Sequence, residues 1–421
     1  MSAQAFTLYI DPGTGSMLFS VFIGAAATLI FLARAMVIKI QILFAGKKAR
    51  EALKAGRKKF VIYNEGKQYW NVFKPILDEF ENRGLELSYL TSDANDPALE
   101  GGWKFVKAEC IGQGNKAFAR LNIMVADVVL MTTPGLDVYQ MKRSKNVSHY
   151  AHVRHGTGDA TMYRLFGIDY FDSILLTGDC QKDDIRYLEK ARGTKEKELV
   201  TVGCSYLDEL KKKMDAIPKE EGHNFTVLVS PSWGPSAILS KYGERLLDPL
   251  ADTGWKIIIR PHPQSVKSEP QILERLKERY QGRGNIEWNF DRDNIYAMKK
   301  ADIMISDFSS IIYDYTFLCD KPVMYVNAAL DLRMYDASEV YNPDGSVKKA
   351  WQFETIEKIG IELKEEQFAK IKQVIQEASD SPALAAARKA AKEQAWMHIG
   401  SAAKNIADFM IKKQGELECK R

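Results

Sequence analysis

The sequence of 421 residues has few cysteines, little net charge and no internal repeat, and each absence excludes a class of protein. The five cysteines are scattered and never spaced as CxxC, so they indicate neither a disulfide framework nor a zinc site. A formal net charge of +4 is too small to indicate a nucleic-acid partner, and no segment interleaves basic and aromatic residues as RNA-binding motifs do. No DxD motif or cluster of His and Cys indicates a metal, and we expect no cofactor.

The remaining composition is that of a folded globular protein. Hydrophobic residues make up 46% of the chain and charged residues 27%. This length is sufficient for two domains and an accessory segment.

The N-terminal segment differs in kind, because residues 17–33 contain no charged residue. As a helix they would span roughly 25 Å, slightly less than the hydrocarbon core of a bilayer. Residues 35–38 would complete the span if Arg34 extends toward the headgroups. No Lys or Arg precedes the run, which argues against a secretory signal. We therefore predict a membrane anchor over residues 1–46, with a buried soluble helix as the alternative.

A basic segment follows the apolar run. Residues 34–59 contain nine Lys or Arg and one acidic residue, Glu51. The positive-inside rule then predicts a single-pass cell-membrane protein with its catalytic domains in the cytoplasm. We expect the juxtamembrane residues 47–59 to contact anionic lipids.

The rest of the chain alternates apolar runs with helical patterns, which predicts parallel sheets covered by helices on both faces. We expect an α/β protein with two Rossmann-like domains, at 60–215 and 222–395, and a C-terminal helix and tail at 396–421. The predicted strands are 60–64, 85–90, 128–131, 148–153, 173–176 and 199–202 in the first half, and 225–229, 255–259, 286–288, 303–306 and 323–326 in the second.

The most informative motif is IMISDFSSIIYDYTFLCDKPVMY, from Ile303 to Tyr325. It reads as a buried strand, a tight turn, a helix from about Ser309 and a second strand. A helix N-terminus with hydroxyls beside it suits a phosphate, because its backbone N–H groups are unpaired and carry partial positive charge. The alternative is that Asp307, Ser309 and Ser310 only cap the helix.

Two further motifs follow predicted strands. Arg260-Pro261-His262-Pro263 follows residues 255–259, and in open α/β sheets ligands bind beyond the carboxyl ends of strands. Arg260 suits a phosphate or, alternatively, pairs with a surface carboxylate. His155 stands in a glycine-bearing turn after residues 148–153, where it can approach a ligand or simply bond a loop carbonyl.

Together these motifs resemble the CDP-glycerol:glycerophosphate glycerophosphotransferase family of teichoic-acid primases and polymerases. The matching pieces, in the family's order, are HGTGD at His155, TVGCSYLDEL at Thr201, SPSWGP at Ser230, RPHP at Arg260 and SDFSSIIYDYTFLCDKPVMY at Ser306. The resemblance implies a GT-B fold, with the CDP-linked donor held mainly by the C-terminal domain and the acceptor reaching in from the N-terminal one.

The resemblance also implies roles for individual residues. We expect His155 and His262 to be catalytic, with His155 as the candidate base. The predicted donor-binding residues are Arg260, Asp307, Ser309, Ser310, Asp314, Ser232, Trp233 and Gly234. Many members carry a Lys after the HGT tripeptide, whereas this chain continues with Gly158 and Asp159. Arg164 is the nearest basic residue downstream, and the predicted acceptor side is Gly156, Thr157, Asp159 and Arg164.

The expected reaction transfers glycerol phosphate, or a related polyol phosphate, to a lipid-linked or glycan acceptor of the cell envelope. The acceptor hydroxyl would attack the β-phosphorus of the CDP-alcohol and CMP would leave. Two alternatives stay open at this point: a GT-B glycosyltransferase that uses a nucleotide sugar, and a membrane-anchored nucleotide-binding protein without turnover.

Overall fold

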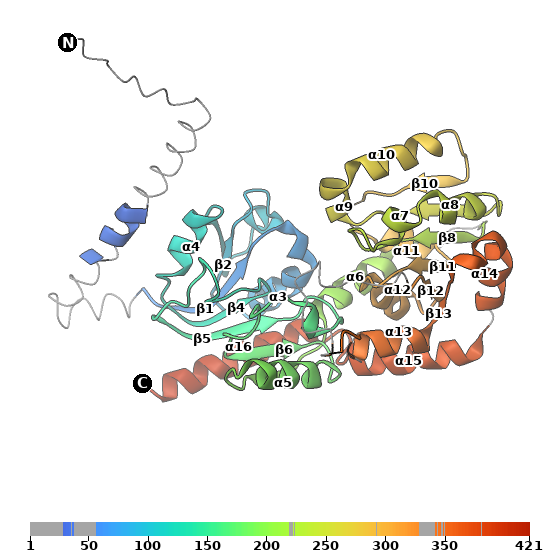
Figure 1. The fold of residues 1–421 in the computed structure, drawn as a ribbon. Coiled ribbons are helices and arrows are strands. Elements are labelled where there is room, and N and C mark those ends of the chain that lie inside the picture. The colour runs from blue at the N-terminus through green and yellow to red at the C-terminus, as the bar shows by residue number, and fades with distance from the viewer. Residues whose placement is uncertain are drawn as a thin grey trace, which may run out of the picture.

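The computed structural model describes residues 28–34, 36–37, 56–218, 222, 224–291, 293–327, 342, 344–346, 348, 350–379 and 381–421. Within them, two parallel sheets stand next to each other, one built from each half of the chain (Figure 1). The first sheet has seven strands: β1 (Lys58–Asn64), β2 (Leu87–Thr91), β3 (Val106–Cys110), β4 (Ala126–Met131), β5 (Val147–Val153), β6 (Ser173–Leu176) and β7 (Glu198–Thr201). The second has six: β8 (Thr226–Val229), β9 (Lys256–Ile259), β10 (Ile286–Trp288), β11 (Ile303–Ser306), β12 (Val323–Tyr325) and β13 (Gly360–Glu362).

The helices connect these strands and cover the sheets. In the first half they are α3 (Trp70–Asn82), α4 (Asn115–Leu121), α5 (Gln181–Arg192) and α6 (Ser205–Ala216). In the second half they are α7 (Ile238–Lys241), α8 (Glu244–Ala251), α9 (Pro263–Ser268), α10 (Pro270–Arg279), α11 (Ile295–Lys300), α12 (Ile311–Cys319), α13 (Trp351–Ile359), α14 (Ile371–Ser379), α15 (Pro382–Ala395) and α16 (Ala402–Cys419).

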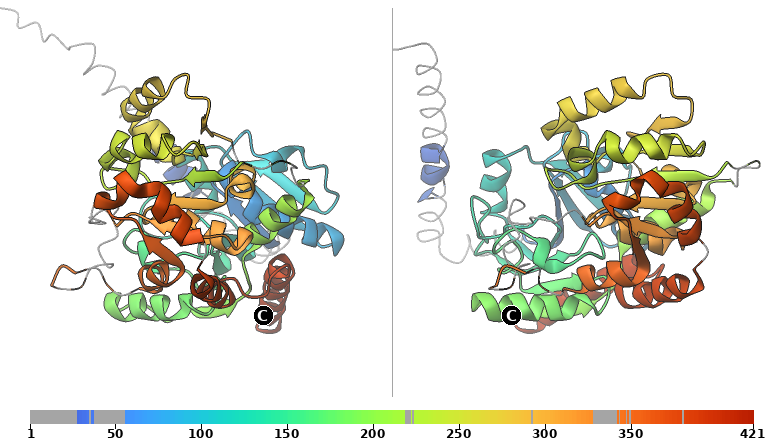
Figure 2. Two further views of the ribbon diagram at one scale, coloured as in Figure 1. Left: turned by 90° about the vertical axis from the view of Figure 1, so that its right-hand side faces the viewer. Right: turned by 45° about the vertical axis from the view of Figure 1, so that its right-hand side comes forward.

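Both sheets are buried on both faces, which explains the long apolar runs in their strands. In β1, Ile62 packs in a core with α3 and α16, while its neighbours Val61 and Tyr63 pack in a separate core with α4 and α5. The second sheet alternates likewise, and two further views show helices around it (Figure 2). The predicted α/β class with parallel sheets is therefore confirmed.

Each sheet reverses its strand order once. The orders are β3-β2-β1-β4-β5-β6-β7 and β10-β9-β8-β11-β12-β13, so the reversal falls between β1 and β4 and between β8 and β11. In open parallel sheets such a reversal leaves a crevice at the carboxyl ends of the strands, where ligands bind. Each half of this chain therefore has one such crevice.

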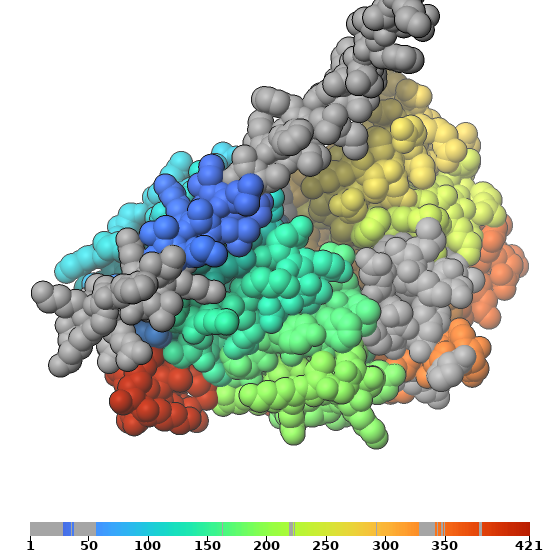
Figure 3. Space-filling view, turned by 60° about the vertical axis from the view of Figure 1, so that its left-hand side comes forward, coloured from blue at the N-terminus to red at the C-terminus, as the bar shows by residue number. Residues whose placement is uncertain are grey.

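The C-terminal helix crosses back to the first half of the chain. Ile406, Ala407 and Met410 of α16 are buried against β1, β4 and α3, and Figure 3 shows the C-terminal end at the surface, next to the N-terminal half of the chain. The two halves are thus joined twice, through α6 and through the chain that leads to α16.

The structure corrects several predicted elements. The strands β3 and β13, both at sheet edges, were not predicted; β3 buries only Val106 and β13 has only three residues. Residues 239–252, whose sequence has a continuous helical pattern, lie in two helices, α7 and α8, which are separated at Gly243, where a φ of 45° interrupts the helix. The helix α6 continues to Ala216, one residue beyond the predicted end of the first domain at 215.

The predicted membrane helix over residues 17–33 lies largely outside the described residues. In this N-terminal segment the structure describes only residues 28–34 and 36–37, which are helical. Among the helices that the structure describes, none is long and apolar enough to cross a bilayer. The anchor at 1–46, and most of the basic segment at 47–59, therefore stay predictions.

Candidate active site

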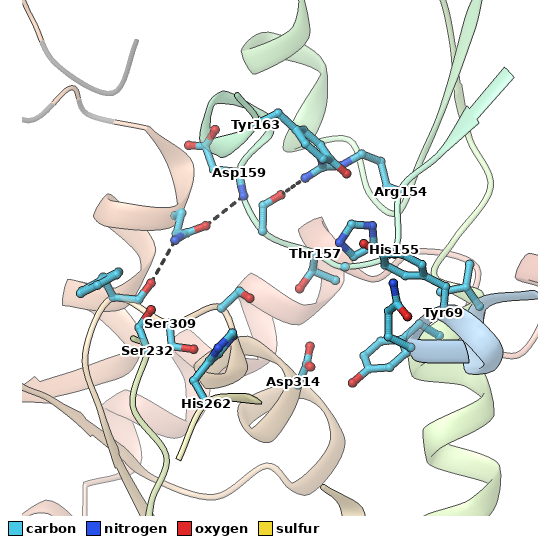
Figure 4. A pocket seen from close by; sticks show the side chains of 18 of the residues that line it. Tyr69, Arg154, His155, Thr157, Asp159, Tyr163, Ser232, His262, Ser309 and Asp314 are labelled. Atoms are coloured by element: carbon cyan, nitrogen blue, oxygen red, sulfur yellow. Dashed lines mark hydrogen bonds between the residues drawn. The ribbon is translucent and has the colours of Figure 1, made fainter. Parts of the chain in front are cut away.

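A cleft between the two sheets collects most of the predicted site residues (Figure 4). It consists of two adjoining cavities of about 550 and about 530 Å³. Turns after β5, β8, β9 and β11 form its walls, so the carboxyl ends of both sheets face it. The two cavities share Gln68, Tyr206, His262, Ser309, Ser310 and Asp314.

His155 lies in the first cavity, on the side of the N-terminal sheet. Its Nδ1 shares a 2.8 Å hydrogen bond with Oγ1 of Thr132, the residue after β4. The ring lies between Tyr69 and Tyr163, with centroid distances of 5.0 and 6.2 Å. Burial, aided by the neighbouring Arg154, lowers the pKa of His155 to about 4. The imidazole is therefore neutral at pH 7, which a proton acceptor requires.

His262 lies across the cleft, at the start of α9, beside Ser232 and Ser309 (Figure 4). Its Nδ1 accepts a 3.0 Å hydrogen bond from the backbone N–H of Gln264. A backbone N–H can only donate, so the neutral ring carries its hydrogen on Nε2. Burial lowers the pKa of His262, which favours this neutral form. The two histidines thus differ in chemistry: His155 is a neutral proton acceptor, whereas His262 presents a fixed hydrogen-bond donor.

The turn between β11 and α12 contains Asp307, Ser309 and Ser310. The Asp307 carboxylate accepts hydrogen bonds from the backbone N–H groups of Ser232, Ile238 and Ser309 at 2.9, 3.1 and 3.2 Å. It therefore joins two loops instead of facing the cleft, which corrects its prediction as a donor contact.

Ser309 and Ser310 do face the cleft. Ser310 is the N-cap residue of α12, yet among the described residues its side chain makes no capping bond to the helix. The hydroxyl is thus not used for capping, so the purely capping interpretation does not describe Ser310.

Asp314 lies one helical turn after Ser310 and borders both cavities. Burial raises the pKa of its carboxyl to about 7, although a hydrogen bond from Tyr206 opposes the rise. A neutral carboxylic acid beside a phosphate can donate a hydrogen bond, whereas a carboxylate would repel it.

Arg260 borders the second cavity, away from His155. Its guanidinium donates to Oδ1 of Asn289 and, at 2.7 Å, to the backbone carbonyl of Asp291. These bonds fix the loop after β10. Arg260 therefore has two roles: it borders the second cavity itself, and it holds the loop after β10 that forms part of the cavity wall.

The loop of Gly156, Thr157 and Asp159 touches the other half of the chain through Gln352 of α13. Oε1 of Gln352 accepts from the backbone N–H of Asp159 at 3.0 Å, and its Nε2 donates to the carbonyl of Phe308 at 3.4 Å (Figure 4). A Cβ at Gly158 would come within 3.1 Å of Oε1 of Gln352. Glycine there allows the two loops to approach.

Other predicted residues lie as follows. Ser232, Trp233, Gly156, Thr157 and Asp159 line the first cavity. Gly234 has a φ of 91° and donates its N–H to Glu269, which makes it a turn residue. Arg164 lines a separate cavity in the N-terminal half, over the ring of Tyr139.

Among the residues that line the cleft, the sequence reasoning missed several, including Tyr69, Arg154, Tyr163, Tyr206 and Gln352. Arg154 could have been found, because it precedes His155 directly. It stacks on Tyr163 and donates to the carbonyl of Gly158 at 2.6 Å, which holds the His155 loop. In the described part of the chain, no group of three or more His, Cys, Asp or Glu is placed to hold a metal ion.

Comparison with known proteins supports the resemblance found in the sequence. Residues 180–343 match the model of the CDP-glycerol:poly(glycerophosphate) glycerophosphotransferase family. This range contains the motifs from Thr201 to Tyr325, while the His155 loop precedes it. No curated protein sequence matches the chain.

Solved structures match over most of the chain. The wall teichoic acid polymerase TagF soaked with CDPG is 14% identical, with a TM-score of 0.58 over 92% of this chain and 98% of that one. The UDP-GlcNAc 2-epimerase of Methanocaldococcus jannaschii, in complex with UDP-GlcNAc and UDP, is 11% identical, with a TM-score of 0.53 over 85% and 99%. At these identities the likeness shows the fold, which is GT-B-like as predicted.

The family resemblance and the prediction of a CDP-glycerol glycerophosphotransferase-like enzyme are thereby confirmed.

Proposed function

We propose that this enzyme transfers glycerol phosphate, or a related polyol phosphate, from a CDP-alcohol to a hydroxyl of a lipid-linked or glycan acceptor. The observation that carries the proposal is the cleft itself. In the cleft, the neutral His155 from the N-terminal sheet lies opposite residues from the C-terminal sheet: His262, which can donate a hydrogen bond, and the hydroxyls of Ser309 and Ser310.

The C-terminal half suits the pyrophosphate of the donor. The N-terminus of α12 carries the partial positive charge of the helix dipole, and the hydroxyls of Ser309 and Ser310 stand beside it. His262 adds its Nε2–H, and Asp314 in its neutral form adds an O–H. These donors would spread the negative charge that develops on the phosphoryl oxygens.

His155 is the proposed general base. In the reaction, the acceptor oxygen forms a bond to the β-phosphorus of the donor while the bond from that phosphorus to the CMP oxygen breaks. The proton of the attacking hydroxyl passes to His155, and CMP leaves as an anion stabilised by His262 and the α12 N-terminus. A pKa of about 4 makes the free imidazole a weak base, but a bound pyrophosphate raises it, because a nearby anion favours the charged ring.

We further propose that the enzyme acts at the cytoplasmic face of the cell membrane, held there by residues 1–46 and the basic residues 47–59. The support is the uncharged run of 17–33 and the excess of Lys and Arg after it.

The test is release of CMP from CDP-glycerol by the purified full-length chain, with and without an acceptor. Acceptor-dependent CMP release supports the proposal. Release of a nucleotide from a UDP-sugar, with none from CDP-glycerol, would favour a glycosyltransferase. Binding of CDP-glycerol without any turnover would indicate a non-catalytic nucleotide-binding protein.

A further inference from the structure

The N-terminal half contains a cavity of its own, of about 540 Å³, apart from the cleft. Residues directly after three strands line it: Glu65 after β1, Ser92 after β2 and Thr133 close behind β4. This is the place where the strand order of the first sheet reverses, the position at which open parallel sheets bind ligands. The corresponding reversal of the second sheet carries the Ser309–Ser310 turn.

Only one layer of side chains separates this cavity from His155. Tyr69 lines both the cavity and the cleft, and its ring centroid is 5.0 Å from that of His155. Thr132 bonds His155 while the next residue, Thr133, lines the cavity. Tyr163 faces the cleft while the next residue, Arg164, lines the cavity. A ligand here would end beside the proposed base.

The polar lining favours hydroxyl groups. Glu65 is largely buried, and burial raises the pKa of its carboxyl against hydrogen bonds from Thr133, Gln68 and Tyr69. Burying a carboxyl costs free energy unless hydrogen-bond donors satisfy it, and its two oxygens can accept from two adjacent hydroxyls. Tyr63 and Ser92, joined by a 2.9 Å hydrogen bond, add two more hydroxyls to the lining.

The remaining walls are aromatic or amide-bearing. Tyr139 and Phe118 provide ring surfaces, and Gln113 and Gln140 provide amides that both donate and accept. Among the residues that line the cavity, Arg164 is the one cation and Glu65 the one carboxylate, so their formal charges balance. This combination of a few fixed polar groups with aromatic walls suits a compact neutral ligand that carries many hydroxyls.

We propose that this cavity is an acceptor subsite, which binds a sugar or polyol unit of the acceptor through its vicinal hydroxyls, with Glu65 as the main hydrogen-bond acceptor. The inference rests on the proposed function in that it names the acceptor of the same reaction. It places the acceptor's terminal hydroxyl at His155 and its preceding unit behind Tyr69.

The first test compares Glu65→Gln with the full-length wild type in acceptor-dependent CMP release. Glu65→Gln exchanges one carboxylate oxygen for an amide donor and removes charge-assisted bonds, so the acceptor KM should rise about tenfold or more. The ratio of transfer to CDP-glycerol hydrolysis by water should fall by a similar factor. Glu86→Gln, at an exposed position of the same half, is the matched control and should match the wild type.

A second variant guards against misfolding. Tyr139 is 54% exposed, so Tyr139→Ala removes a cavity wall without opening the core, and it should raise the acceptor KM several-fold. An unaltered acceptor KM in both variants would overturn the proposal. So would an equal loss of transfer and hydrolysis in Glu65→Gln, because it would show that Glu65 merely supports His155.

A binding measurement separates this inference from the proposed function. Saturation-transfer NMR without any donor would use methyl glucoside as the sugar probe and ribitol as the polyol probe. A signal from either probe that Glu65→Gln abolishes supports the subsite and identifies its source, even if the wild type releases no CMP. Active wild-type enzyme that shows no Glu65-dependent signal with either probe would refute the subsite and leave the transferase proposal standing.

Discussion

Replacement of Gln352 by Leu should uncouple the two halves of the active site. Gln352 is 5% exposed and bonds the Asp159 backbone on one side of the cleft and the Phe308 backbone on the other. Leucine has a similar volume, so the change removes both hydrogen bonds without leaving a large cavity.

The expected loss of unfolding free energy follows from the two buried backbone groups that the substitution leaves without a partner, the N–H of Asp159 and the carbonyl of Phe308. A buried backbone group that loses its partner costs about 1–3 kcal/mol. The bond to Asp159 is 3.0 Å long and the bond to Phe308 is 3.4 Å, so the second contributes toward the lower end. We expect unfolding to become easier by about 2–4 kcal/mol. Loss of the two hydrogen bonds should also free the His155 loop from the Ser309 turn. We expect kcat to fall roughly 10- to 100-fold, because a catalytic group displaced by about 1 Å can reduce the rate by this factor.

The assay pairs denaturant unfolding with steady-state CMP release. Gln373→Leu is the matched control, because Gln373 is exposed and bonds only the neighbouring Glu377 among the described contacts. It should match the wild type in both measurements. Gln352→Glu keeps an acceptor for Asp159 but opposes the Phe308 carbonyl with a second oxygen, so it should fall between. A Gln352→Leu enzyme with wild-type kcat and unfolding free energy would refute the reasoning.

Three further outcomes are expected. Burial raises the pKa of Asp314 to about 7, so its carboxylate should repel the donor above that pH. The affinity for CDP-glycerol, measured by calorimetry, should then fall by up to about tenfold per pH unit above pH 7, and Asp314→Asn should remove this dependence. His155→Ala should retain donor affinity yet lose roughly 10²–10⁴-fold in turnover. On the acid side, the wild-type kcat/KM should decline as pH falls through about 4, and a decline at the usual histidine value would mean that His155 is not the base. Deletion of residues 1–46 should leave weak binding to anionic vesicles that fades with salt in a sedimentation assay, and salt-independent binding would contradict the electrostatic argument.

The alternation of apolar runs and helical patterns was sufficient to predict eleven strands, each of which the structure contains. Burial on both faces makes such strands continuous apolar runs, which are visible in a single sequence. The strands β3 (VKAEC) and β13 (GIE) were missed because they consist largely of Lys, Glu, Ala and Gly, which are depleted in strands, so their residues carry little strand signal. The motifs at His155, His262 and Ser309 could likewise be placed at strand ends, because strand ends are local features.

Which side chains meet was decided by the tertiary structure. Asp307 and Ser310 stand three residues apart and look alike as helix caps, but Asp307 joins loops around β8 while Ser310 faces the cleft. Arg260 is a plausible phosphate ligand by type, and only the fold brings Asn289 to it. Gln352 lies 193 residues from Asp159 in the sequence. Periodicity and turn chemistry fix how a segment folds locally, whereas contacts between distant segments depend on how two sheets pack, which no local pattern encodes.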